Sequence, residues 1–574
     1  MNLRARTALV VVSLIQGATA CVAWENRSIP TDAATIAKGE ATFSQSCSGC
    51  HNFTQDGIGP QLAGLTSQVS ASWIERFVRD RSKLLDAGDK RARELLGRYS
   101  VPMPSYASLT PDEMTALVAY INAKKTRDVQ APTTAQPVSD PIPNAITPST
   151  LVVGLQFVTK IPASSDHGQL PLTRITKLDK EPGSGRTFVL DLRGKLYELH
   201  GSAPTVYMDM AKLKPKFIHE PGLATGFGSF AFHPDFARNG LLYTTHTESA
   251  GSGKADFAYA DSIKVALQWV LTEWKVADPR ASTFSGTGRE LFRVNMVSGI
   301  HGVQEIAFNP TAKPGAEDYG MLYIGIGDGG AVENRYVFLA HSKEQVWGTI
   351  LRIDPLGRNS RNGQYGIPAG NPWVRVPGAL GEIFAYGFRN PHRLTWTASG
   401  QLLAPNIGHG TIESVNLVLP GHDYGWPIRE GTFALESYGD LNKVYPLPAN
   451  DSVYGVTYPV AQYDHDGITS AISGGYAYEG TSIPALGGKY LFGDIPTGRL
   501  FYVNLSDLSQ GKQAPIYSWN VSLNGVQKTL KELCGTDRVD LHFGRDQAGA
   551  LYLLTKPDGK VYRIVSATTS HGER

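Results

Sequence analysis

The chain has 574 residues, too many for one compact hydrophobic core, so we expect at least two domains. Its 54 basic and 52 acidic residues leave a formal net charge of +2, and no basic stripe suggests a nucleic-acid partner. With 61 glycines, 35 prolines and 41% hydrophobic residues, the composition excludes a disordered chain and is typical of a globular protein rich in turns and strands.

Residues 1–20 have the pattern of an export signal. Two arginines precede a short apolar run, and Ala18-Thr19-Ala20 provides an A-x-A cleavage site. We therefore expect an exported, periplasmic protein. Two alternatives stay open, an uncleaved anchor and lipidation at Cys21, although a lipoprotein signal would normally carry leucine in place of Ala18. No later segment has the length and apolar character of a membrane span.

A pair of thiols follows in the segment Cys47-Ser48-Gly49-Cys50-His51. Zinc needs four ligands and no second pair has the usual spacing, while a redox dithiol needs a thioredoxin-like βαβ setting that this region lacks. A histidine directly after the second cysteine is the attachment pattern of c-type haem, in which both thiols bond the haem vinyl groups. We therefore predict covalent haem at Cys47 and Cys50, with His51 as the proximal iron ligand.

The surrounding segments fit a helical haem domain over residues 31–125. We expect one helix from about 31 to 46 and a second, capped at Leu109-Thr110-Pro111-Asp112-Glu113, that runs to Lys124. Between them, the loop that begins at Gly59-Pro60 is suited to pass close to the haem and orient the imidazole.

A methionine completes the predicted iron site. Met103 lies on a loop between two prolines, as a distal ligand requires, whereas its rival Met114 has the apolar neighbours of a core residue. This order of motifs resembles class I cytochrome c, which implies an all-α domain with His51 and Met103 on the haem iron.

Residues 126–149 are dense in Pro, Thr and Ala and predict a stiff interdomain linker. Beyond it, residues 150–567 repeat a glycine-led, β-rich unit. The six units begin at Gly185, Gly240, Gly320, Gly400, Gly488 and Gly549. A β-sandwich would also supply many strands, but it would not repeat this unit six times. We therefore predict an all-β six-bladed propeller, in which polar residues at unit ends, such as His246, Asp328, His409 and Asp494, converge on one mouth.

Four stretches of the second domain go beyond a generic propeller. They are "GLATGFGSFAFHPDFARNGLLY" from Gly222, "HGVQEIAFNP" with "YGMLYIGIGDGG" from His301, "GEIFAYGFRNPHRLTW" from Gly381 and "NIGHGTIESVNLVLPGHDYGWP" from Asn406. Together they resemble the glucose/sorbosone dehydrogenase family, which consists of soluble six-bladed quinoproteins that use pyrroloquinoline quinone (PQQ) and calcium.

The resemblance implies a role for each matching residue. His301 would be the base that takes the substrate hydroxyl proton, and Asp328 would orient and charge it. Arg389 would stabilise negative charge on the quinone oxygen, and Asn390 would hydrogen-bond the cofactor. The calcium ligands would be the carbonyls of Gly408 and His409 and the carboxylate of Glu413.

Simpler structural roles stay open for these residues: a turn histidine at His301, a stabilised glycine turn at Asp328 and a structural salt bridge at Arg389. The chain also departs from the family. Glu479 stands where a basic residue would pair with the acidic quinone, and Thr497 occupies a second basic position, with Arg499 close by.

The sequence therefore predicts a periplasmic quinohaemoprotein dehydrogenase. It would oxidise a sugar, an aldose-like compound or an alcohol at PQQ and pass electrons through its own haem to a soluble or membrane-bound acceptor. The alternative, favoured by Glu479, is an electron-transfer cytochrome whose propeller is a cofactor-free binding or docking module.

Overall fold

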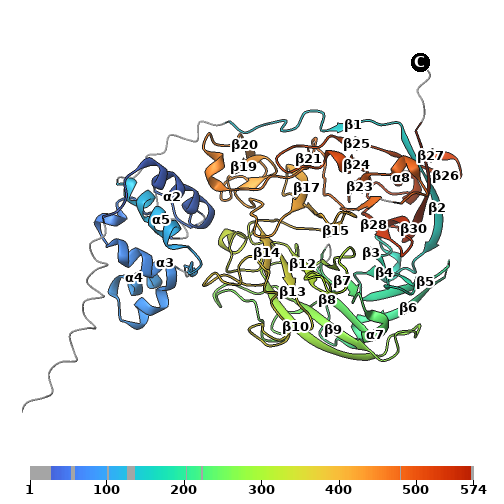
Figure 1. Cartoon of the computed structure of the whole chain (residues 1–574), viewed down its shortest axis with the longest axis horizontal. Helices are drawn as coiled ribbons and strands as arrows, with labels where there is room; N and C mark the ends of the chain where they lie inside the picture. Colours follow the sequence, from blue (N-terminus) through green and yellow to red (C-terminus); the bar gives the residue numbers. More distant parts are fainter. Residues whose placement is uncertain are drawn as a thin grey trace, which may run out of the picture. The chain divides into compact units, whose positions relative to one another are not determined.

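A computed structural model describes residues 28–48, 50–53, 59–99, 103–125, 136–201, 203–221, 224–478 and 480–569. The chain divides into two compact units, Met1–Thr133 and Thr134–Arg574, and the division falls within the predicted linker (Figure 1). The predicted export signal, Cys21 and Glu479 lie outside the described residues. Within the described part, no helix is both long enough and apolar enough to cross a membrane.

The described elements of the first unit are helical. They are α2 (Ala33–Ser46), the 3₁₀ turn η1 (Leu65–Ser67), α3 (Ala71–Asp86), α4 (Lys90–Arg98) and α5 (Pro111–Ala123). Both predicted helices are confirmed as α2 and α5, whereas α3 and α4 were not expected. The start of α5 is a capping box, in which the Thr110 hydroxyl accepts from the Glu113 N–H and the Glu113 carboxylate accepts from the Thr110 N–H.

Helices α2 and α5 pack against each other with almost no space between their backbones. A Cβ atom added at Gly39 would lie 1.9 Å from the Ala116 carbonyl oxygen. One turn further along α2, the Phe43 ring lies 5.4 Å from Tyr120 and 4.8 Å from Phe53, measured between ring centroids. The glycine thus permits the helix contact that the aromatic cluster then stabilises.

The second unit is β-rich, and most of its strands pair antiparallel with their neighbours in the chain. Three sheets have four strands each. The first contains β7 (Phe227–Phe232), β8 (Leu241–Ser249), β9 (Leu267–Val276) and β10 (Gly286–Met296); the second, β11 (Glu305–Phe308), β12 (Leu322–Ile326), β13 (Thr349–Ile353) and β14 (Ile383–Tyr386); the third, β15 (Thr395–Trp396), β16 (Leu402–Asn406), β17 (Ile412–Val418) and β21 (Ala461–Asp464).

A five-stranded sheet follows the same pattern, and its parallel edge strand is β1. It contains β22 (Tyr476–Tyr478), β23 (Lys489–Gly493), β24 (Leu500–Asn504), β25 (Ile516–Ser518) and β1 (Ile146–Thr147). A small sheet of β18 (Arg429–Glu430), β19 (Phe433–Leu435) and β20 (Val444–Tyr445) lies in a long insertion.

The largest sheet joins the two ends of the second unit. One part is β3 (Ile175–Lys180), β4 (Thr187–Asp191), β5 (Lys195–His200) and β6 (Ala203–Asp209); the other is β28 (Leu541–Arg545), β29 (Leu551–Thr555), β30 (Lys560–Thr569), β2 (Leu151–Lys160), β26 (Asn520–Leu523) and β27 (Val526–Lys528). A single parallel pairing, Gly544 with Leu178, connects these two parts. The unit also contains short helices α6 (Met210–Leu213), α7 (Phe236–Asn239) and α8 (Leu530–Cys534), so the expected all-β description is too strict.

The six glycine-led units correspond to equivalent strands. They form β4, β8, β12, β16, β23 and β29. Each of these strands pairs with the strand directly before it in the chain. Every leading glycine has a positive φ, from 59° at Gly240 to 84° at Gly400. A left-handed turn of this kind favours glycine, which explains why the same residue begins each unit. Neighbouring sheets pack against each other: Trp269 and Leu271 of β9 share a hydrophobic core with Ile324 of β12.

We expect Gly39→Ala to destabilise the first unit by about 1–3 kcal/mol, the usual cost of overpacking, because the new methyl group must push α2 away from α5. Gly97→Ala in α4 is the matched control, since Gly97 is exposed and a Cβ there meets nothing within 4 Å. It should stabilise the helix by about 0.5–1 kcal/mol. Thermal unfolding followed through the haem absorption distinguishes the two, and equal midpoints would contradict the proposed contact.

Candidate functional site

The first unit contains a cavity of about 310 Å³ with an apolar wall. Cys47, Cys50, His51 and Met103, the four residues predicted to hold haem, all line it. The structure thus brings together a pair of thiols, an imidazole and a thioether that are spread over more than fifty positions of the chain. This donor set in an apolar cavity fits c-type haem.

The orientation of His51 is fixed by its neighbours. Its Nδ1 lies 2.8 Å from the Pro60 carbonyl oxygen, and donation there leaves Nε2 as the atom with a free lone pair for a metal. Burial lowers the pKa of His51, which favours the neutral, ligating form. A Cβ at Gly59 would lie 2.5 Å from the imidazole Cε1, so the predicted loop passes directly over the ring.

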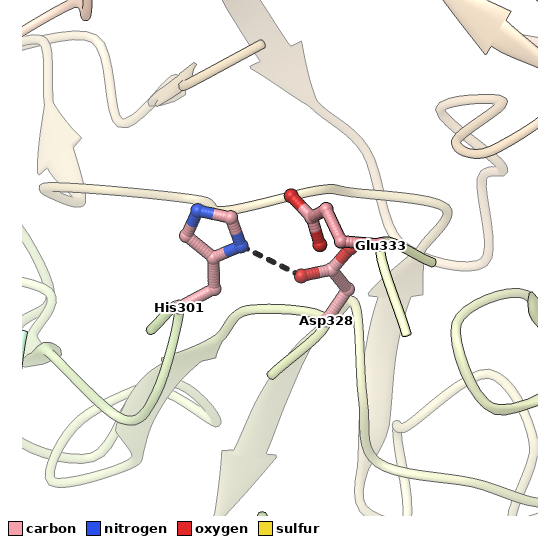
Figure 2. Close-up of side chains that lie close together, drawn as sticks. All are labelled: His301, Asp328 and Glu333. Carbon is pink, nitrogen blue, oxygen red and sulfur yellow. Dashed lines mark hydrogen bonds and ion pairs between the residues drawn. The ribbon is translucent and has the colours of Figure 1, made fainter. Parts of the chain in front are cut away.

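In the second unit, His301 and Asp328 form a hydrogen-bonded pair (Figure 2). His301 precedes β11 and Asp328 follows β12, and antiparallel pairing of these strands brings the two side chains together. The His301 Nδ1 lies 2.8 Å from the Asp328 Oδ1. His301 also has a φ of 50°, a backbone conformation that is uncommon for a residue with a side chain.

The Asp328 carboxylate is fully buried and accepts two further hydrogen bonds. The Trp426 indole Nε1 donates to Oδ2 at 3.0 Å, and the Gly330 backbone N–H donates to Oδ1 at 2.9 Å. Because each oxygen of this carboxylate has a donor, the Asp328 side chain is held in place, as a residue that orients His301 requires.

Arg389 follows β14 and lies beside this pair. The Asp328 N–H donates to the Arg389 carbonyl oxygen at 2.7 Å. The Arg389 guanidinium donates to the Gly408 carbonyl and to the Glu333 Oε1, and it lies over the Trp426 ring. Its Nε is buried without an acceptor among the described residues. Asn390 is also buried, and its backbone N–H donates to the Asn406 side chain at 3.0 Å.

Glu333 is a site residue that we did not predict from the sequence. Its carboxylate and the side chains of His301 and Asp328 have ligand atoms that all lie within 4.8 Å of one another (Figure 2). Burial acts to raise the pKa of Glu333, but a hydrogen bond from His409 and the charges of Arg389 and His301 outweigh it and hold this pKa well below its usual range. Glu333 therefore adds a fixed negative charge to the site.

Two of the three predicted calcium ligands accept hydrogen bonds in this structure. The Gly408 carbonyl accepts from Arg389. Glu413 is fully buried, and its two oxygens lie 3.0 Å from the His465 Nε2 and 2.9 Å from the Ile472 backbone nitrogen. This arrangement does not fit a calcium ion, which needs several oxygen atoms free to point at it.

The expected convergence of strand-end residues holds for Asp328 and His409, which both contact the Arg389–Glu333 pair. His246 instead hydrogen-bonds Glu248, and Asp494 accepts hydrogen bonds from its own turn at Thr497 and from Ser470. Thr497 is thus part of a turn.

A protein-family model described as Glucose / Sorbosone dehydrogenase matches residues 183–563. The chain belongs to the glucose/sorbosone dehydrogenase family. A second model, described as Cytochrome c, matches residues 36–125, so the family domain here follows an N-terminal cytochrome c domain.

The chain is similar to two curated proteins and one solved structure. "HIPL2 protein" of Arabidopsis thaliana is 28% identical over 440 residues, which cover 67% of this chain and 60% of the relative. "Quinoprotein glucose dehydrogenase B" of Acinetobacter calcoaceticus is 25% identical over 273 residues, 44% of this chain and 49% of the relative. The chain thus spans about half to three fifths of the length of these relatives. The PQQ-bound aldose sugar dehydrogenase of Streptomyces coelicolor aligns with a TM-score of 0.48 at 19% identity, over 74% of this chain and all of the other.

A signal for Glu333 was present in the sequence. It lies five positions after Asp328 in the same glycine-rich turn, "GDGGAVE", which keeps it close to the end of β12. An acidic residue so near a motif aspartate and a motif arginine could have been assigned to the site, but its pairing with Arg389 depends on tertiary structure.

We expect Met103→Ala to abolish the weak near-infrared methionine-to-iron band of the oxidised haem. The haem potential should fall by about 0.1 V or more, within the range of about 0.8 V that axial ligands cover. Met114→Leu is the control, because Met114 is buried in α5 and a volume-conserving change should leave both properties unaltered. An unchanged band and potential in Met103→Ala would exclude Met103 as the ligand.

Proposed function

We propose that this chain is an exported, periplasmic quinohaemoprotein dehydrogenase. It oxidises a sugar, an aldose-like compound or an alcohol at PQQ and passes the electrons to its own covalent c-type haem. The observation that carries the proposal is the His301–Asp328 pair beside a buried arginine, in a chain that also carries a haem-attachment motif on the wall of an apolar cavity.

His301 would act as the general base. Since its Nδ1–H is donated to Asp328, the lone pair lies on Nε2, which can take the proton of a substrate hydroxyl. The imidazolium that results is stabilised by the adjacent carboxylates of Asp328 and Glu333. PQQ, when bound, would accept a hydride, and with it two electrons, from the carbon that carries this hydroxyl.

Arg389 and Asn390 would hold the quinone. The unpartnered, buried Nε of Arg389 fits a ligand that offers carbonyl or carboxylate oxygens, because a buried donor without an acceptor is costly. Glu333 opposes an acidic cofactor, so this carboxylate must release the guanidinium or turn away when the cofactor binds. No step of the mechanism passes through Gly408, His409 or Glu413.

We further propose that the β-rich unit is a six-bladed propeller. The four-stranded groups that begin with β3, β7, β11, β15, β22 and β28 would be the blades, the last being completed by β2. Two observations support this: each group contains one glycine-led unit, and residues of all six first strands line a single cavity of about 290 Å³, as expected at the end of a central channel.

The haem would serve as the one-electron acceptor that a two-electron dehydrogenase needs. Ligation by His51 and Met103 raises the haem potential and so favours electron flow from the substrate side. A soluble or membrane-bound cytochrome or oxidase chain would then reoxidise the haem. The sequence pattern of residues 1–20 supports export.

A second function is favoured by one observation, the ion pair between Arg389 and Glu333 at 2.5 Å. If this pair never opens, the arginine is neutralised by the protein itself and an acidic cofactor has no anchor. The propeller would then be a cofactor-free module that docks the cytochrome to a partner, as the position of Glu479 also suggests.

We expect His301→Ala to lower the rate of sugar-dependent haem reduction by about 10²–10⁴-fold, the usual contribution of a positioned base, with PQQ binding retained. Stopped-flow absorption with a panel of aldoses measures the rate, and reduction by added dithionite is the control for an intact haem. Arg389→Ala should lose PQQ affinity as well as rate. Wild-type protein that binds no PQQ, with or without added calcium, would end the dehydrogenase interpretation.

We expect Glu333→Gln to bind PQQ at least tenfold more tightly than the wild type, because a charge-assisted hydrogen bond of about 1.5–3 kcal/mol no longer competes for Arg389. Fluorescence titration with PQQ measures the affinity. Glu317→Gln is the matched control, since Glu317 also pairs with an arginine, Arg352, but is largely exposed and lies outside the site. Equal affinities in the wild type and Glu333→Gln would mean that the pair does not hinder the cofactor.

A further inference from the structure

The cavity lined by the first strands lies away from the His301 site. His301 stands before β11, whereas the cavity is bordered by the last residue of this strand, Phe308, and by the ends of its counterparts at Lys180, Phe232 and Trp396. The cavity is therefore lined by β11 itself and by the segment that follows it, whereas His301 precedes β11, and nothing in the dehydrogenase chemistry uses the cavity.

The wall of this cavity has an excess of positive charge. It carries Lys177, Lys180 and Arg545 against two carboxylates, Asp179 and Glu305. Glu305 is already shared between Lys177, at 2.8 Å, and the buried guanidinium of Arg393. One carboxylate, Asp179, is left for the two remaining cations of the wall.

Lys180 and Arg545 have weak partners. The closest carboxylate oxygen to the Lys180 Nζ belongs to Asp179, at 4.0 Å. Arg545 lies with its Cζ 5.2 Å above the Tyr476 ring, and its guanidinium has no hydrogen bond or ion pair within the described part of the chain. Burial lowers the pKa of Lys180, and the charges of Arg545 and Lys177 act in the same direction, against those of Asp179 and Asp546. An anion in the cavity would relieve this repulsion.

Trp396 adds an unused donor at the same place. Its side chain is 4% exposed and lines the cavity, yet its indole N–H has no acceptor in the described structure. This N–H is therefore available to donate to a ligand in the cavity.

We propose that this cavity binds a small organic carboxylate with a flat apolar body. Arg545, Lys180 and the Trp396 N–H would hold the carboxylate, and the rings of Phe232, Phe308 and Tyr476 would contact the body. A volume of about 290 Å³ lies at the low end of ligand pockets, which run from about 300 to 1,000 Å³, and so limits the ligand to a small molecule.

Isothermal titration of the full-length haem-containing protein tests the proposal with benzoate as the probe. Benzamide, a neutral molecule of the same shape, and sulfate, an anion without an apolar body, are the comparison ligands. We expect saturable benzoate binding at least tenfold tighter than that of either. Arg545→Met and Lys180→Met should each weaken benzoate binding at least tenfold, and Trp396→Phe, which keeps the ring, several-fold.

Arg563→Met is the matched control, because Arg563 is exposed on the outer strand β30 and should leave benzoate binding unchanged. Sugar-dependent haem reduction should also be unaffected by Arg545→Met. The proposal is overturned if benzoate does not bind, if benzamide or sulfate binds equally well, or if Arg545→Met, Lys180→Met and Trp396→Phe all bind benzoate as the wild type does.

Discussion

The geometry around His301 depends on one buried negative charge, the carboxylate of Asp328. An ionised carboxylate without partners in the protein interior costs several kcal/mol, so the fold must supply donors to it. Two donors come from distant segments, His301 and Trp426, and the third, Gly330, belongs to the turn of Asp328 itself. Meeting this requirement holds the imidazole, a glycine turn and a tryptophan in one arrangement, and the Asp328 N–H fixes the Arg389 backbone at the same point.

The two candidate cofactor sites are prepared in different ways. In the haem cavity, the Pro60 carbonyl sets the His51 tautomer and the wall is apolar, so the site is ready for its group. In the second site, Arg389 is already paired with Glu333, which also contacts His409, although the Arg389 Nε and the Glu333 Oε2 have no partner among the described residues. Binding there must exchange one set of ionic contacts for another, and its net free energy is a difference between large opposing terms.

Features that depend on local chain geometry were predictable from the sequence. The spacing of Cys47, Cys50 and His51 and the capping residues before α5 specify their structures within a few positions, and each glycine-led unit became a strand because its turn needs a positive φ. Helices α3 and α4 were not predicted, although the apolar residues of α3 have the spacing of an amphipathic helix. The pairings of Glu333 with Arg389 and of Glu413 with His465 join residues 56 and 52 positions apart, which a single sequence does not reveal.

The strand β2, near the start of the second unit, pairs along nearly its whole length with β30, the last strand. During synthesis, β2 is made hundreds of residues before β30. The edge of β2 that pairs with β30 therefore has no partner during most of the synthesis of the domain. The domain therefore lacks this strand pair until residues 560–569 have been synthesised. A chain truncated before β30 would leave this edge of β2 exposed, and an unpaired strand edge is a template for aggregation.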